Sequence, residues 1–173
     1  MINKNITKNE VLEMVMKNGI ALAFASDELR NDKKVVLSAV QQKGVALRFA
    51  SAELRADREV VESAVRWDGG ALEYASDELR ADREFVLGAI NRCWRALEFA
   101  SDELRNDKEV VMAAVDNYSG ALQYASEELK SDREVVMAAV KQNGRALKHA
   151  SDALKYDRDL IDYMLEEINS DWW

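Results

Sequence analysis

Apolar residues along the chain form short helical stripes separated by polar turns. Within residues 60–65, the apolar side chains occupy the first, second, fifth and sixth places. This spacing puts them on one face of an α-helix, whereas a half-buried strand would alternate apolar and polar residues. Residues 71–75 carry a second, shorter stripe, and residues 77–80 form a third helical turn in which Leu79 points inward. The pattern therefore predicts a helix of about eleven residues, a shorter one and a connecting turn.

This pattern is repeated along the chain at a constant interval. The motif Ala-Leu-x-x-Ala-Ser recurs every 25 residues without insertion, beginning at Ala21, Ala46, Ala71, Ala96, Ala121 and Ala146. A single unit cannot bury its apolar stripe, so the units must stack on one another. We expect an all-α fold, a right-handed α-solenoid of about six 25-residue repeats with atypical capping ends. We expect a single domain spanning 1–173, organised as a half-unit 1–18, repeats from about 19, 44, 69, 94 and 119, and a final repeat with C-terminal cap 144–173.

Polar residues and glycine mark the expected element boundaries. Asp57 precedes a long stripe and is the expected N-cap, and Ser76 is expected to cap the third helical turn. Gly69 follows the long helix, where a left-handed residue often ends a helix, so we expect that conformation there.

The ends of the chain differ from the middle. A small residue inside the long helix allows close approach of the next repeat, and Met14 and Met164 replace it at the two ends. Trp172 and Trp173 are expected to cover the last helix, and the alternatives are a loose tail or pairing with a second copy of the chain. The internal small residues are Ala39, Ala64, Ala89, Ala114 and Ala139.

The motif resembles a known tandem-repeat family, the domain of unknown function 4116. The resemblance covers nearly the whole chain and includes the segment Glu-Leu-Arg-x-Asp-Arg-Glu-Val-Val-x-x-Ala-Val, close copies of which recur in most repeats. It implies a helical repeat fold and no established activity, cofactor or site. The departures are Trp94 and Ser119 in place of the turn glycine and Ala153 in place of a recurring glutamate.

Charged residues recur in three columns. We interpret them as an ionic and capping ladder that fixes the register between repeats, and the alternative is a charged groove for a peptide or ligand. The columns are Glu28, Glu53, Glu78, Glu103 and Glu128; Arg30, Arg55, Arg80, Arg105, Lys130 and Lys155; and Asp32, Asp57, Asp82, Asp107, Asp132 and Asp157.

An aromatic column runs through the second helix and is expected to be a packing ladder, with a ligand-stacking stripe as the alternative. The turn residues vary more between repeats, and two tryptophans there are typical of an interface. The alternative is neutral variation on exposed turns, or packing of Trp94 on its neighbour. The predicted partner-binding edge consists of Trp67, Asp68, Arg92, Trp94, Arg95 and Tyr118. The aromatic column consists of Phe24, Phe49, Tyr74, Phe99, Tyr124 and His149.

Composition limits the partners. The formal net charge of −8 disfavours nucleic acid and anionic membrane surfaces, and no stretch approaches the ~20 apolar residues of a membrane span. The single cysteine, Cys93, excludes an intrachain disulfide, and the start of the chain lacks the apolar run of a signal peptide. We therefore expect a cytoplasmic protein.

Catalysis is not expected. Cys93 and the single histidine, His149, are separated by two repeats, and a zinc site would need more His or Cys ligands. The carboxylates recur identically in each repeat, whereas an active site should occur once. We predict no cofactor, no metal and no enzymatic activity.

The leading hypothesis is that the chain is a protein- or peptide-interaction module, and we expect a monomer in preference to a dimer. The alternatives are a structural spacer or self-associating scaffold, followed by small-ligand binding or an enzyme.

Overall fold

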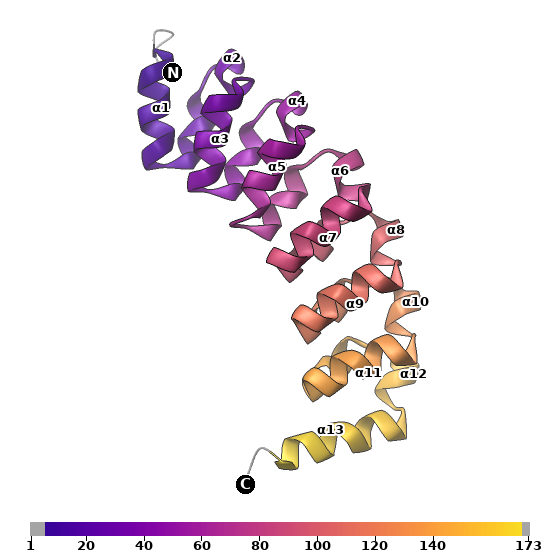
Figure 1. The fold of residues 1–173 in the computed structure, drawn as a ribbon. Helices are drawn as coiled ribbons and strands as arrows, with labels where there is room; N and C mark the ends of the chain where they lie inside the picture. The colour runs from indigo at the N-terminus through magenta and orange to yellow at the C-terminus, as the bar shows by residue number, and fades with distance from the viewer. Residues whose placement is uncertain (1–5, 171–173) are drawn as a thin grey trace. The chain divides into compact units, whose positions relative to one another are not determined.

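The chain is helical throughout the part that the structure describes. The computed structural model describes residues 6–170, with side chains up to residue 165, and contains no strand in that range. It divides into two compact units, Met1–Phe99 and Ala100–Trp173, which are described separately below. Figure 1 shows the helices of each unit stacked side by side. The expected all-α class is therefore confirmed.

Each repeat consists of a 3₁₀-helix, a four- or five-residue α-helix and a long α-helix, in that order along the chain. In the first unit the long helices are α1 (Lys8–Lys17), α3 (Lys33–Gln42), α5 (Arg58–Val65) and α7 (Arg83–Arg92), the 3₁₀-helices are η1 (Gly19–Phe24), η2 (Gly44–Phe49), η3 (Gly69–Tyr74) and η4 (Trp94–Phe99), and the short helices are α2 (Asp27–Arg30), α4 (Ala52–Arg55) and α6 (Asp77–Ala81). In the second unit the long helices are α9 (Lys108–Asn117), α11 (Arg133–Gln142) and α13 (Arg158–Ser170), the 3₁₀-helices are η5 (Ser119–Tyr124) and η6 (Gly144–His149), and the short helices are α8 (Asp102–Arg105), α10 (Glu127–Lys130) and α12 (Asp152–Lys155).

Both predicted caps are present. The carboxylate of Asp57 accepts a hydrogen bond from the backbone amide of Val60 at 3.1 Å, and the other aspartates of this column cap their helices in the same way. The hydroxyl of Ser76 accepts from the amide of Leu79 at 3.4 Å. These bonds satisfy amides that have no partner within the helix, so each cap fixes where its helix begins.

The core of each unit lies between successive repeats. In the first unit α1 packs on α3, α3 packs on α5, and η1 to η4 contact one another in order. In the second unit α9 packs on α11, α11 packs on α13, and η5 contacts η6. Val36, Leu47 and Val61 are fully buried in these contacts. Burying an aliphatic side chain of this size contributes about 1.5–3 kcal/mol.

Backbone hydrogen bonds between repeats add directional contacts to this apolar packing. The amide of Ser51 donates to the carbonyl of Arg30 at 3.0 Å, which joins the start of α4 to the end of α2. The same bond joins Ser126 to Arg105 in the second unit, at 2.9 Å. Equivalent bonds join Ser76 to Arg55 and Ser151 to Lys130, so within the units these N-cap residues tie one short helix to the one before it.

The prediction of a left-handed glycine after the long helix is wrong. Among the described residues, neither glycine nor any other residue has a positive φ. The glycines are needed because the next repeat comes too close for a side chain. A Cβ at Gly44 would stand 2.5 Å from the carbonyl oxygen of Ala64, and one at Gly69 would stand 2.7 Å from Sγ of Cys93.

Methionine stands in the first and last repeats at the position that is alanine in the internal ones. Met14 is 39% exposed, whereas the equivalent Ala39 and Ala64 are fully buried between repeats. Met164 is half-buried, and its side chain fills the space that faces Gly144. The predicted C-terminal cap of Trp172 and Trp173 lies outside the described residues.

Candidate functional site

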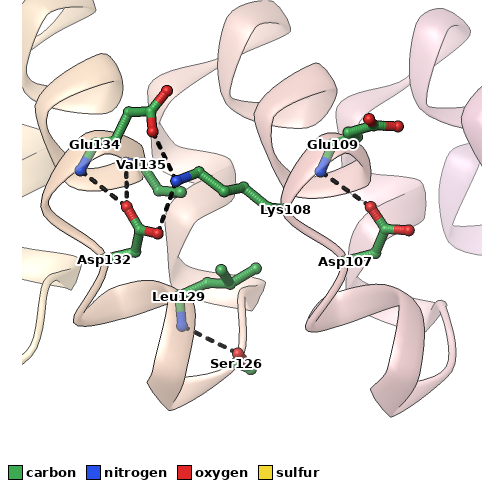
Figure 2. Close-up of polar contacts among 8 residues, drawn as sticks. All are labelled: Asp107, Lys108, Glu109, Ser126, Leu129, Asp132, Glu134 and Val135. Atoms are coloured by element: carbon green, nitrogen blue, oxygen red, sulfur yellow. Dashed lines mark hydrogen bonds and ion pairs between the residues drawn. The ribbon is translucent and has the colours of Figure 1, made fainter.

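A ladder of ion pairs crosses from each long helix to the next within the units. In Figure 2, the ammonium of Lys108 donates to Asp132 at 2.8 Å and to Glu134 at 2.7 Å. The other oxygen of Asp132 accepts from the amides of Glu134 and Val135, at 2.9 and 3.2 Å. Asp132 is therefore both helix cap and ion-pair partner, which is what the ladder interpretation of the aspartate column predicts.

The first unit repeats this arrangement. Lys33 contacts Asp57 and Glu59 at 2.8 and 2.7 Å, and Arg58 contacts Asp82 at 2.6 Å. The cation is the first residue of each long helix, a column that the sequence analysis did not identify. The signal was present in the sequence, because a lysine or arginine follows every capping aspartate.

The ladder lowers the pKa of several capping aspartates. A hydrogen bond from Lys108 holds the pKa of Asp132 below its usual value, and Lys33 does the same for the pKa of Asp57. For Asp82 the amide of Phe85 is the largest cause of the lowered pKa, followed by Arg58. A carboxylate held in this way is a poor proton donor near neutral pH.

The other two charged columns serve the short helices. Arg80 pairs with Asp77 of its own helix at 2.7 Å, and the cations at the equivalent positions of α2, α8, α10 and α12 pair in the same way. The recurring glutamates are exposed, and one of them, Glu53, accepts a hydrogen bond from Asn31 at 3.1 Å. We assign these columns to the fold.

The predicted partner-binding edge divides between the two units. Trp67 is 74% exposed, whereas Trp94 is half-buried. Asp68 accepts a hydrogen bond from the amide of Gly70 at 3.0 Å, so it caps η3. Arg92 and Arg95 are exposed and donate to Glu62 and Glu98, at 3.1 and 2.9 Å. Tyr118, 47% exposed, belongs to the second unit.

Trp67 lies at a groove between α3 and α5 that the sequence did not predict. The groove has a volume of about 450 Å³. Its half-buried residues are Leu37, Glu62 and Ser63, and its other lining residues are exposed. We call it the α3–α5 groove; its lining residues are Leu37, Gln41, Glu59, Glu62, Ser63, Arg66 and Trp67.

The second unit has an equivalent groove between α9 and α11, with a volume of about 370 Å³. Three repeats separate the two, so Met112 corresponds to Leu37 and Lys141 to Arg66. The second groove has Met137 where the first has Glu62, so the lining of the second groove is more apolar. The groove is thus a recurring feature whose lining changes from repeat to repeat.

The aromatic column lies on the 3₁₀-helices and is mostly half-buried. Phe49, Tyr74 and Phe99 are half-buried in the first unit, and Phe24 is 60% exposed. The guanidinium of Arg48 stands 4.7 Å from the centre of the Phe49 ring, within range of a cation–π contact. These side chains can therefore both pack between repeats and contact solvent.

Comparisons with known proteins give one result. A family model described as a domain of unknown function (DUF4116) matches the chain three times, over residues 8–55, 57–105 and 107–155, so that each match spans two repeats. No curated protein and no solved structure matches the chain. In the part of the chain that the structure describes, no helix is both long and apolar enough to span a membrane, and no cluster of His, Cys, Asp or Glu has the arrangement of a metal site.

Proposed function

The chain belongs to the family of the domain of unknown function 4116, and from this premise we propose that it is a non-catalytic α-solenoid that binds a protein or peptide partner. In the first unit α1 packs on α3 and α3 on α5, in the second α9 packs on α11 and α11 on α13, and the ladder repeats at the same positions. Continuing this stacking through about six repeats makes a solenoid. Such folds present long surfaces on which partners bind.

One observation carries the proposal, the exposure of Trp67 beside the α3–α5 groove. A tryptophan that is 74% exposed leaves a large apolar ring in water. Tryptophan and arginine are the residues that most often dominate binding energy at interfaces, and Arg66 lines the same groove. A partner side chain in the groove would cover the ring and the half-buried Leu37 together.

The charge pattern supports a role without catalysis. The lowered pKa values of Asp57 and Asp132 belong to carboxylates already bonded to a lysine and to helix amides. Because this arrangement recurs in each repeat, it has the regularity of a structural device. An enzyme would need one site that differs from the others.

Exchange of Trp67 for alanine tests the proposal. We expect Trp67→Ala to reduce partner capture from native cell extract by at least about tenfold, the effect of losing an interface anchor. Tyr156→Ala is the matched control, since Tyr156 is 81% exposed and lies on neither groove. Thermal melting by circular dichroism should be unchanged in both variants. Equal capture by the wild type and by Trp67→Ala would contradict the proposal.

A structural spacer that self-associates is the second candidate. The observation in its favour is the exposed apolar surface of the first repeat, which includes Met16 at 61% and Phe24 at 60%. Light scattering over a range of protein concentrations separates the two functions. We expect a monomer at all concentrations, and a mass that grows with concentration would favour the spacer.

A further inference from the structure

A cluster of cations surrounds an apolar pocket in the second unit. The pocket, of about 380 Å³, lies over η6, and Gly144, Leu147 and Met164 provide its apolar surface. Three cations, Arg145, Lys148 and Lys155, also line the pocket, and none of the lining residues whose side chains the structure describes is acidic. This concentration of positive charge is unexpected in a chain whose net charge is −8. We call it the η6 pocket.

Two of the three cations, Arg145 and Lys148, are exposed. Lys155 pairs with Asp152 at 3.0 Å, but Arg145 and Lys148 make no ion pair with any residue whose side chain the structure describes. Lys130, which holds the position of Lys155 in the preceding repeat, has a 19% exposed side chain that pairs with Glu127. The pKa of His149 is lowered, mainly by burial and then by the positive charges of Lys148, Lys130 and Lys155.

The apolar part of the pocket follows from the repeat. Within each unit every 3₁₀-helix but the last contacts the next one, as η5 contacts η6. This contact buries Leu122 completely, whereas the equivalent Leu147 stays 6% exposed. Leu147 lines the pocket together with Met164, which is half-buried.

We propose that the η6 pocket binds an acidic segment of a partner protein through one apolar anchor and flanking carboxylates. The anchor packs on Leu147 and Met164, as the leucine of a following repeat would. The carboxylates pair with Arg145 and Lys148. A free inorganic anion would leave the apolar floor uncovered, whereas an acidic peptide satisfies both parts of the lining. Charge complementarity of this kind governs both association rate and choice of partner.

Fluorescence anisotropy with a short synthetic peptide, in which leucines stand between glutamates, tests the proposal on the full chain. We expect Lys148→Glu to weaken binding by at least about tenfold and Lys148→Gln by less, because reversal adds repulsion to the lost pair. The matched control is Lys34→Glu, the same charge change at an exposed position on α3. A peptide with glutamine in place of glutamate, and one with serine in place of leucine, should both bind more weakly.

Two further readouts locate the bound peptide. The methyl resonance of Met164 should shift on titration, and the pKa of His149 should rise, since peptide carboxylates offset the surrounding cations. Trp67→Ala should bind the peptide as the wild type does, which separates this site from the α3–α5 groove. Loss of peptide binding in Trp67→Ala, or equal losses in Lys148→Glu and Lys34→Glu, would overturn the proposal.

The remaining outcomes concern other occupants. Displacement of the peptide by inorganic phosphate alone would show a simple anion site. Binding that occurs only after removal of residues 171–173 would show that the chain's own end competes for the pocket. Dimerisation that Lys148→Glu abolishes would place a second copy there. Each of these results would overturn the proposal of an acidic partner segment.

Discussion

The capping aspartate has two functions that one substitution can separate. In Asp132, one carboxylate oxygen accepts from helix amides and the other contacts Lys108 of the preceding repeat (Figure 2). Asparagine keeps the accepting oxygen and removes the charge, whereas alanine removes both. The pair of variants therefore distinguishes the cap from the ion pair.

We expect Asp132→Ala to lower the free energy of unfolding by about 1 kcal/mol, the usual effect of losing an N-cap. Asp132→Asn should lose less, and its loss should disappear at high salt because the remaining difference is a screened surface ion pair. Urea unfolding at low and high salt measures both. Equal losses in the two variants would show that the charge, and not the cap, dominates at this position.

The glycines differ in what surrounds them. Gly44 has no room for a Cβ because the carbonyl of Ala64 is too close, whereas a Cβ at Gly88, inside α7, would have no neighbour within 4 Å. We expect Gly88→Ala to stabilise the protein by about 1 kcal/mol through helix propensity. Gly44→Ala should destabilise it by about 1–3 kcal/mol, as overpacking does. Thermal or urea unfolding of the two variants checks the difference in sign.

At the level of the element, the sequence predicted helix starts better than helix type. Asp57 and Ser76 mark starts because a capping side chain acts on amides only a few residues away. The 3₁₀ geometry of residues 69–74 was not predicted, because an apolar spacing over six residues is compatible with both helix types. The reason for Gly69 was also missed, since it depends on Cys93, which belongs to the following turn.

The candidate site was predictable only in part. Trp67 stood out because the repeat itself gives no reason for a tryptophan there, and its exposure agrees with that reasoning. The groove beside it was missed, since Leu37 and Ser63 are brought together by the distance between two helices and not by sequence spacing. The η6 pocket was missed for a similar reason, because Arg145 and Lys155 are separated along the chain and no block of basic residues reveals them.

The ladder between long helices also sets how stability depends on pH. Lys33 lowers the pKa of Asp57 below 3.8, so the folded state gains stability that is complete above this value and is lost as the pH falls through the lowered pKa. Asp57 and Glu59 raise the pKa of Lys33 above 10.5, so that contribution is complete below this value and is lost as the pH rises through the raised pKa.

Lys33→Met should make the free energy of unfolding depend less on pH, at both the acidic and the alkaline end. It removes the largest cause of the lowered pKa of Asp57, so unfolding free energy should fall less steeply on acidification below about pH 3.8 than in the wild type. Urea unfolding across the pH range measures this. Lys34→Met, the control at the next residue, should follow the wild type, and an acid limb unchanged in Lys33→Met would contradict the assigned cause.

At the scale of the whole molecule, the first repeat ends the ladder. The capping residue there is Thr7, whose hydroxyl and Glu10 form a capping box, so the helix start is kept without an aspartate. Asn9 replaces the acidic residue that accepts the second ion pair in other repeats, such as Glu59. The first helix therefore lacks both the aspartate cap and the second carboxylate that accept the ladder cation in a repeat such as the one begun by Asp57.

The repeat length gives the strongest test of the architecture. Deletion of residues 44–68 removes one 25-residue unit and brings Gly69 to the place of Gly44. The ladder is then restored with new members, because Lys33 meets Asp82 and Glu84 in place of Asp57 and Glu59. We expect this variant to fold, with a lower melting temperature, because it loses one interface between repeats and keeps the others.

Deletion of residues 44–56 alone is the control, because it removes only half a unit. It places polar positions where Val60 and Val61 are buried, so this variant should not unfold cooperatively. Circular dichroism melts of the two variants measure this, and equal damage from both deletions would show that the units do not act as interchangeable modules.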